Sequence, residues 1–276
     1  MKGMVIYMNN KPIGVFDSGL GGLTMIKKLI ELLPGEDLIY LGDTGRVPYG
    51  PRSRETIAKY AGQDAAFLAK HGIKAMVVAC NTVCSVALDS LKSIYTIPIY
   101  EVVNAPAKVA AALTKNGKIG VIGTAATIRS GAYETVLKNI NAKLNVYSIP
   151  CPLFVPLTEE GWTGAADDVS LSIASRYLDG LCKEDIDTLI LGCTHYPLLR
   201  DIISKTMGPA VTLVDSGAET AKQVACDLKD KDLLNENKTG GTIKYYVTDT
   251  VQGFSSMASV FLESDVNGMV EQISLD

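Results

Sequence analysis

The sequence of 276 residues is poor in several features that would assign it to a specialised class of protein. It has 26 basic against 30 acidic residues and no long basic run, which argues against nucleic acid as a partner. Its longest apolar stretches are strand-sized, well short of the roughly 20 residues that a membrane helix needs. Residues 1–10 carry one lysine and no long apolar core, so they do not resemble a secretory signal, and we expect a cytoplasmic protein.

Cysteine and histidine are also scarce, with six and two residues respectively. The thiols are too sparse for a disulfide scaffold, and reduced thiols are the default in the cytoplasm. Cys80 and Cys84 have no nearby histidine at zinc spacing, so we expect no metal site. The apolar content of 47% is typical of a folded globular protein, and the length allows one large or two medium domains.

Short apolar runs alternate with helical stretches along most of the chain. Runs typical of strands lie at residues 13–16, 38–41, 75–79, 97–100, 118–122, 146–149, 188–191, 211–214 and 243–247. Helical patterns lie at residues 23–33, 53–71, 131–140 and 169–181. This alternation predicts an α/β fold with mostly parallel sheets flanked by helices.

Two segments repeat one arrangement and indicate two similar lobes. Ala79-Cys80-Asn81-Thr82 and Gly192-Cys193-Thr194-His195 each follow a buried-type strand and lie about one small domain apart. We predict a first lobe from residues 11–104 and 211–276, a second lobe from 105–210, an active-site cleft between them and an N-terminal extension at 1–10. The return at 211 rests on Val-Asp-Ser-Gly at 214–217, which resembles the opening of the first lobe.

The two cysteines are the leading candidates for chemistry. Ligands of open α/β sheets bind outside the carboxyl ends of the strands, and a thiol there can be a nucleophile, a base or an acid. One such cysteine is more simply a small buried residue, but two in matching context favour function. Asp17 ends the first strand and reaches the same edge as Cys80, while His195 is a credible acid, base or thiolate stabiliser beside Cys193.

Small polar residues surround these thiols. Backbone N–H groups of the glycine-rich turn at 19–22 can hold a carboxylate without arginine, together with polar side chains. The side chains are those of Ser18, Asn81, Thr82, Thr124 and Thr194. Each one alone is as readily a helix cap as a ligand contact. Tyr49 and Gly50 lie in a long loop shaped by proline and glycine, and such loops often carry binding groups.

A dinucleotide-binding oxidoreductase is the strongest rival from sequence. Gly19-Leu20-Gly21-Gly22 is followed by Asp43 at roughly the distance of a ribose-binding acid, which would imply NAD(P). Two features weaken this hypothesis. Thr24 occupies the position of the third glycine, and Asp17 puts a negative charge just before the supposed pyrophosphate loop.

Seven segments in order resemble the aspartate/glutamate racemase superfamily, and within it the glutamate racemases. They are Gly14-Val15-Phe16-Asp17-Ser18-Gly19-Leu20-Gly21-Gly22, Asp43-Thr44 through Pro48-Tyr49-Gly50, Ala79-Cys80-Asn81-Thr82, Gly120-Val121-Ile122-Gly123-Thr124 with Thr127, Phe154-Val155-Pro156-Leu157 with Glu159, Gly192-Cys193-Thr194-His195-Tyr196-Pro197-Leu198, and Val214-Asp215-Ser216-Gly217. Each alone would be a weak signal, whereas the combination is highly specific.

The resemblance implies an isomerase that interconverts L- and D-glutamate without a cofactor and supplies D-glutamate for peptidoglycan, and so for cell-wall biogenesis and cell shape. It implies that Cys80 deprotonates D-glutamate and Cys193 L-glutamate, assisted by Asp17 and His195. Glu159 is implied as a residue at the edge of the site, although Glu160 beside it leaves that choice open. The implied substrate-binding residues are Asp17, Ser18, Tyr49, Gly50, Asn81, Thr82, Thr194 and His195, with Thr124 and Thr127 as further candidates.

The resemblance also implies a homodimer with glutamate as its small-molecule partner. An aspartate racemase of the same superfamily is a sister hypothesis. A binding protein that keeps the cleft without catalysis remains open as a different class. A hydrolase using a cysteine and a histidine is a lesser alternative, because it would leave one of the two thiols idle.

Overall fold

The computed structural model describes residues 9–237 and 239–275, and it confirms an α/β fold built from parallel sheets. The strands are β1 (Ile13–Asp17), β2 (Leu38–Gly42), β3 (Ala75–Val78), β4 (Ile99–Glu101), β5 (Lys118–Gly123), β6 (Asn145–Pro150), β7 (Thr188–Gly192), β8 (Thr212–Asp215), β9 (Ile243–Val247) and β10 (Val270–Gln272). The predicted N-terminal extension lies mostly outside the described residues.

Helices follow most of the strands. They are α2 (Leu23–Leu32), α3 (Arg54–Lys70), α4 (Asn81–Ile94), α5 (Asn104–Leu113), α6 (Ala125–Ser130), α7 (Ala132–Ile140), α8 (Phe154–Glu159), α9 (Asp168–Lys183), α10 (Arg200–Met207), α11 (Ser216–Asp230) and α12 (Val251–Leu262), with a short 3-10 helix η1 (Tyr196–Leu199). None of the helices in the described part of the chain has the length and apolar character needed to cross a bilayer.

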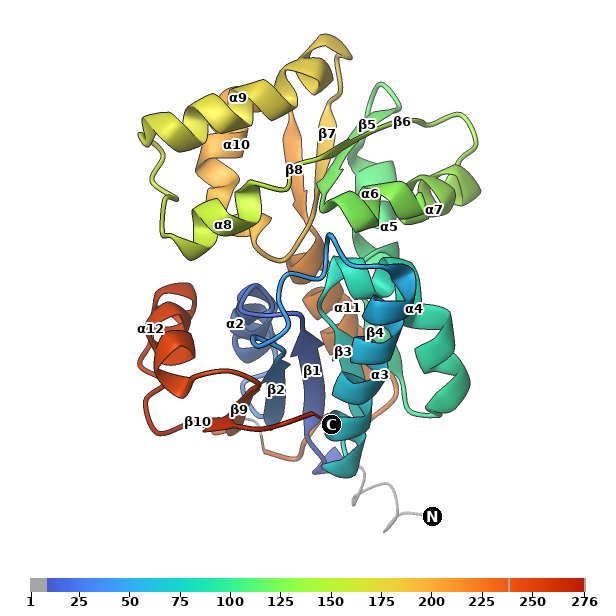
Figure 1. The fold of residues 1–276 in the computed structure, drawn as a ribbon. Helices are drawn as coiled ribbons and strands as arrows, with labels where there is room; N and C mark the ends of the chain where they lie inside the picture. Colours follow the sequence, from blue (N-terminus) through green and yellow to red (C-terminus); the bar gives the residue numbers. More distant parts are fainter. Residues whose placement is uncertain (1–8, 238, 276) are drawn as a thin grey trace.

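The strands form two separate sheets, drawn one above the other in Figure 1. The first has the order β10-β9-β2-β1-β3-β4 and the second the order β6-β5-β7-β8, and the neighbouring strands pair in parallel. Strands β1, β2, β3 and β7 are buried along their whole length, as expected of parallel sheets covered on both faces. The fold therefore brings the carboxyl ends of β1, β3, β5 and β7 towards the boundary between the two sheets.

One predicted boundary is wrong. The strand expected to open the return to the first lobe is β8, which pairs with β7 as part of the second sheet. The second sheet thus extends past residue 210, and the chain returns to the first half with α11, which packs against α2, and with β9 and β10 of the first sheet. The misleading signal was the repeated Asp-Ser-Gly. Asp215 accepts a hydrogen bond from the backbone N–H of Ala218 and so caps α11, a local strand-to-helix turn that any lobe can use. With this shift, the division into two lobes stays a prediction.

The segment between β2 and α3 contacts both halves of the molecule, each half being one sheet with its flanking helices. It leaves the first sheet after Gly42 and runs along the boundary between the halves before Ser53 caps α3 (Figure 1). Gly50 approaches the second half so closely that a Cβ placed on it would lie 3.1 Å from Cβ of Thr124. We call residues 43–50 the bridging loop.

Candidate active site

Cys80 lies at the carboxyl end of β3 and is the N-cap residue of α4, as its position after an apolar strand predicts. Its thiol donates a hydrogen bond to Oγ of Ser18 at 3.5 Å, so β1 and β3 bring these two residues together. Burial and the nearby charge of Asp17 raise the pKa of Cys80 to about 12. This thiol therefore holds its proton at neutral pH.

Cys193 lies at the carboxyl end of β7, with its sulfur 3.9 Å from Nδ1 of His195. The other ring nitrogen of His195 lies 3.1 Å from Oε1 of Glu159, at the end of α8. Burial opposes a charged imidazole, but the hydrogen bonds to Cys193 and Glu159 outweigh it and raise the pKa of His195 to about 10. The sulfur of Cys193 thus faces an imidazolium, the kind of cation that stabilises a thiolate.

Asp17 lies behind this pair of thiols and is fully buried at the end of β1. Its carboxylate accepts hydrogen bonds from the backbone N–H of Gly19 at 3.1 Å and from Oγ1 of Thr194 at 3.4 Å. Burial raises its pKa, although the charge of His195 and these hydrogen bonds oppose the shift. Asp17, on the first sheet, therefore contacts Thr194, which follows Cys193 beyond strand β7 of the second sheet.

The two cysteines share one small cavity of about 30 Å³. Its lining residues are Ser18, Val47, Pro48, Tyr49, Gly50, Cys80, Asn81, Thr82, Thr124, Val155, Cys193, Thr194 and His195. Ten of these thirteen residues were predicted from the sequence. Two are the cysteines, and the other eight, His195 among them, are predicted substrate contacts. The remaining three are Val47, Pro48 and Val155. Space of this size holds about two water molecules, so the cavity is narrow in this structure.

Three predicted residues stand just behind the cavity rather than in its lining, among the described residues. Each one hydrogen-bonds a lining residue. Asp17 accepts from Thr194, the hydroxyls of Thr127 and Thr124 lie 3.0 Å apart, and Glu159 contacts His195. The doublet at 159–160 is also resolved, because Glu159 faces His195 while Glu160 is exposed. These three residues are placed to orient other side chains.

Glycine at position 21 permits the closest approach between the two halves. A Cβ there would lie 2.2 Å from Oγ1 of Thr194 and 2.5 Å from Nδ1 of His195, distances that real Cβ atoms do not show. Thr24, one turn further on, donates a hydrogen bond to the backbone oxygen of Thr194 at 3.1 Å. The glycine-rich turn therefore packs against the segment that follows Cys193, and the Thr24 side chain adds a hydrogen bond to the same segment.

Asn81 is held from two sides by residues that sequence reasoning missed. Its Oδ1 accepts a hydrogen bond from the hydroxyl of Tyr133 at 2.6 Å, and its Nδ2 donates to Oγ of Ser216 at 3.3 Å. Tyr133 belongs to α7 and Ser216 to α11, so both partners are distant in the chain. No local pattern could have identified Tyr133, whereas Ser216 stood within the repeated Asp-Ser-Gly. Val47, Pro48 and Val155 were also missed as lining residues, although each lies inside a quoted segment.

The phenol of Tyr49 points away from the cavity between the two cysteines into a buried polar cluster. It hydrogen-bonds the carboxylates of Asp43 and Asp64, and Arg46 bonds the same two carboxylates. Thr248 adds a hydrogen bond to Asp43 at 2.7 Å. Tyr49 can therefore reach a ligand in the cavity only through atoms other than its hydroxyl.

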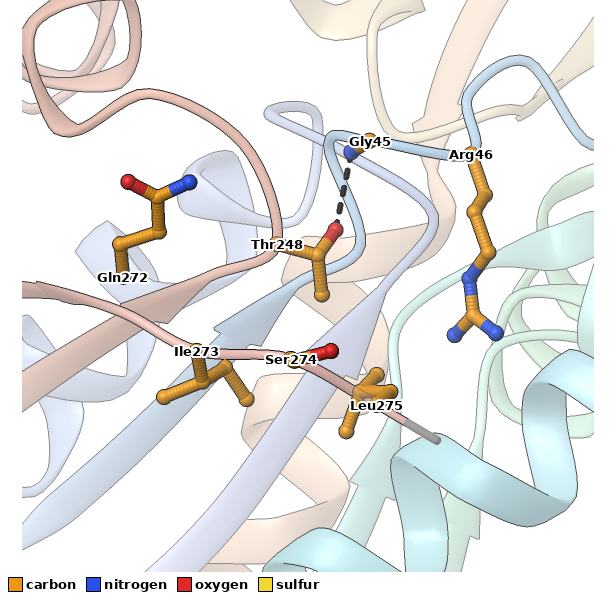
Figure 2. Close-up of a pocket in the computed structure, with 7 residues that line it drawn as sticks. All are labelled: Gly45, Arg46, Thr248, Gln272, Ile273, Ser274 and Leu275. Carbon is orange, nitrogen blue, oxygen red and sulfur yellow. Dashed lines mark hydrogen bonds between the residues drawn. The ribbon is translucent and has the colours of Figure 1, made fainter.

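A larger hollow of about 500 Å³ lies on the outer side of the bridging loop, next to the C-terminal segment. Figure 2 shows Gly45 bonded to the hydroxyl of Thr248 and the Arg46 side chain extending from the same loop. The hollow is lined by Gly45, Arg46, Thr248 and residues 272–275, and it contains none of the predicted site residues. The predicted site residues thus line the small cavity between the sheets and not the larger hollow.

Similarity to known proteins decides the family. The family model described as Asp/Glu/Hydantoin racemase matches residues 13–224. The chain belongs to this racemase family. A curated relative of the racemase, the glutamate racemase of Geobacter metallireducens, is 48% identical over 266 residues and spans 96% of this chain and 97% of the relative.

Solved structures agree with this assignment. The racemase superposes on the crystal structure of a glutamate racemase isoform from Bacillus anthracis with a TM-score of 0.92, at 39% identity, covering 97% of this chain and 98% of the other. The glutamate racemase of Francisella tularensis in complex with D-glutamate gives a TM-score of 0.90 at 40% identity, covering 97% and 99%. The predicted resemblance, the fold class and the assignment as an amino-acid racemase are confirmed.

Proposed function

We propose that this racemase interconverts L- and D-glutamate by a two-base mechanism in which Cys80 and Cys193 act on opposite faces of Cα. The observation that carries the proposal is the shared cavity, which both thiols line from different sheets. Racemisation removes a weakly acidic proton from one face and delivers another to the opposite face. Two sulfurs suffice if one is a thiolate and the other a thiol.

The charges around the two thiols support a defined resting state. His195, with its raised pKa, stabilises a thiolate at Cys193, while the raised pKa of Cys80 keeps its proton on sulfur. In this state Cys193 takes the α-proton of L-glutamate, forming its S–H bond as the Cα–H bond breaks. Cys80 then gives its S–H proton to the opposite face of the carbanion and becomes the thiolate. The resulting form, with a thiol at Cys193 and a thiolate at Cys80, can act on D-glutamate.

The remaining residues are proposed to bind or to position. Asp17 is close enough to assist Cys80 electrostatically, and Glu159 orients His195. The substrate carboxylates and amine would contact Ser18, Asn81, Thr82, Thr124 and Thr194, together with backbone groups of Tyr49 and Gly50. Preorganised donors in a cavity this small would stabilise the carbanion far better than water does.

Closure is part of the proposal. A cavity of about 30 Å³ cannot take up glutamate unless its walls part. Contacts between the halves, such as the 2.9 Å contact of the Thr82 and Thr124 hydroxyls, would then break and reform in each cycle. Closing over the substrate would also exclude water from the carbanion.

Glutamate is favoured over aspartate by the similarity to named glutamate racemases, including the Francisella tularensis enzyme in complex with D-glutamate. In the cell we propose a cytoplasmic homodimer that supplies D-glutamate for peptidoglycan. No cofactor has a part in the proposed chemistry.

The direct test measures the optical activity of each amino acid after incubation with the purified enzyme. We expect L-glutamate to lose its circular dichroism signal without added cofactor, and L-aspartate to change far more slowly. Cys80→Ser and Cys193→Ser should each lose most of the activity. Wild-type behaviour of both variants would overturn the two-base mechanism, and faster turnover of aspartate would overturn the choice of substrate.

A further inference from the structure

The buried cluster beneath the bridging loop contains two carboxylates that converge on one phenol. Oδ2 of Asp64, on α3, lies 3.1 Å from the hydroxyl oxygen of Tyr49, and Oδ2 of Asp43 makes a shorter hydrogen bond to the same hydroxyl. Both carboxylates are fully buried, and Tyr49 is 1% exposed. Tyr49 therefore holds the bridging loop against α3 through Asp64.

Counting protons shows that both carboxyl groups cannot be ionised in this arrangement. A phenol has one proton and can donate to only one of the two oxygens. If both were carboxylates, the second contact would set a carboxylate oxygen against a lone pair of the phenol oxygen, with no proton between them, in a buried site. A proton on Oδ2 of Asp64 removes this conflict, because Asp64 then donates to Tyr49 while Tyr49 donates to Asp43.

The other contacts decide which carboxyl holds the proton. Asp43 accepts from Tyr49, from Nε of Arg46 at 2.7 Å and from Oγ1 of Thr248 at 2.7 Å. Besides its contact with Tyr49, Asp64 has the longer bond from Nη2 of Arg46, at 3.1 Å. Three donors stabilise an anion far better than one. Asp43 is thus the anion that balances Arg46, and a neutral Asp64 leaves the cluster without net charge.

The surroundings of Asp64 act on its ionisation in both directions. Burial, Asp43 after β2 and Asp17 at the end of β1 oppose its ionisation, whereas the charge of Arg46 and the hydrogen bond with Tyr49 favour it. The net effect raises the pKa of Asp64 well above its ordinary value. Arg46 also contacts two groups besides the carboxylates. Its Nη1 donates a hydrogen bond to Gln63 at 2.6 Å, and its guanidinium stacks 4.1 Å from the centre of the Tyr60 ring.

We propose that Asp64 is a positioning residue that works as a neutral carboxylic acid, donating its proton to Tyr49 and so fixing the bridging loop at the wall of the substrate cavity. This inference rests on the proposed function only in so far as the loop binds substrate. Loss of the proton would bury a second negative charge opposite Asp43 with one guanidinium between them. The bridging loop would then loosen, and the Michaelis constant would rise with pH.

Asp64→Asn is the informative variant, because an amide keeps both hydrogen bonds and cannot ionise. Its NH₂ group can donate to Tyr49 and its oxygen can accept from Arg46. We expect KM for L-glutamate at pH 7 within about threefold of wild type and no alkaline rise in KM beyond that of the catalytic groups. Asp64→Ala removes both contacts and should raise KM about tenfold or more with a smaller effect on kcat.

The proton itself can be observed without any substrate. Infrared difference spectra of the full-length enzyme at pH 7 should show a protonated carboxyl C=O band that disappears in Asp64→Asn. Asp89→Asn, which removes an exposed carboxyl on α4, is the matched control and should leave that band in place.

The outcomes separate this proposal from the proposed function. Absence of the band at pH 7, or a rise in KM in Asp64→Asn equal to that in Asp64→Ala, would show that Asp64 acts as an anion and would overturn the proposal. Lack of glutamate turnover by the wild type would overturn the proposed function instead. The carboxyl band would still decide the protonation of Asp64.

Discussion

Oε1 of Glu159 lies 3.1 Å from Nε2 of His195, and the other ring nitrogen of that histidine faces the sulfur of Cys193. A carboxylate, an imidazole and a thiol thus form a line from the partly exposed end of α8 into the closed cavity. Because Glu159 helps to keep His195 protonated, removing the charge of Glu159 should change the pH dependence of catalysis when L-glutamate is the substrate.

Glu159→Gln should lower the pKa of His195, because the imidazolium loses a negative partner. For wild type we expect the alkaline limb of kcat/KM for L-glutamate near pH 10, set by His195. In the variant this limb should move to lower pH, and a pH–rate profile measures it. Glu160→Gln, which changes the exposed neighbour, should leave the limb in place. Identical profiles for the two variants would contradict the role of Glu159.

Gly21→Ala should disable the site without unfolding the protein. The added Cβ meets the side chains of Thr194 and His195 at distances that force those side chains to move. Misplacement of about 1 Å at such a site can cost about 100-fold in rate, and we expect kcat/KM to fall at least that far.

Gly62→Ala is the control for the glycine change. Gly62 lies within α3, and a Cβ there meets nothing within 4 Å. This variant should keep full activity and gain about 0.5–1 kcal/mol in free energy of unfolding, since alanine is the better helix former. Equal activity of the two variants would contradict the close approach at Gly21.

Tyr133→Phe should weaken substrate binding more than turnover. The substitution removes the hydrogen bond to Oδ1 of Asn81 and leaves that buried amide free to rotate away from Ser216. Leaving a buried acceptor unpaired costs about 1–3 kcal/mol, so we expect both lower stability and a higher KM. Steady-state kinetics and denaturant unfolding measure these effects. A loss of stability with an unchanged KM would show that Tyr133 does not position Asn81.

Glu36→Gln should destabilise the protein strongly while leaving the chemistry intact. Glu36 lies 2.5 Å from Nζ of Lys74, and both side chains are almost fully buried. Removing one charge of a buried pair leaves the other uncompensated, at a cost of about 3–5 kcal/mol. Asp179→Asn breaks the exposed pair with Lys183 and should have no measurable effect. Denaturant midpoints compare the two variants, and equal midpoints would contradict the buried role of Lys74.

The sequence was most informative where function depends on strand ends. The two cysteines, Asp17 and the glycine-rich turn follow apolar strands directly, so a parallel sheet must bring them to one edge. The start of α3 was likewise predicted at residue 53, where Ser53 caps the helix by accepting from the backbone N–H of Thr56, a contact that depends on the next three residues alone. Local rules suffice for such features.

The features that sequence reasoning missed depend on contacts between distant elements. Asp64 is an unremarkable helical residue until the bridging loop brings Tyr49 to it, and Tyr133 acquires its role only when the fold brings its hydroxyl to Asn81, at the start of α4. The assignment of β8 failed for a related reason, since a strand's own residues do not specify its neighbour. The choice between Glu159 and Glu160 also required the direction of the last turn of α8.

The central claim is that two thiols work on opposite faces of Cα, and the fate of deuterium tests it most directly. L-glutamate is incubated with the enzyme in D₂O, and the deuterium at Cα of each enantiomer is measured during the first few per cent of turnover. The two-thiol account predicts deuterium in the D-glutamate formed and almost none in the remaining L-glutamate, because different sulfurs remove and deliver the protons. Equal early labelling of both enantiomers, or D-glutamate that keeps the original proton, would indicate a single base and contradict the account.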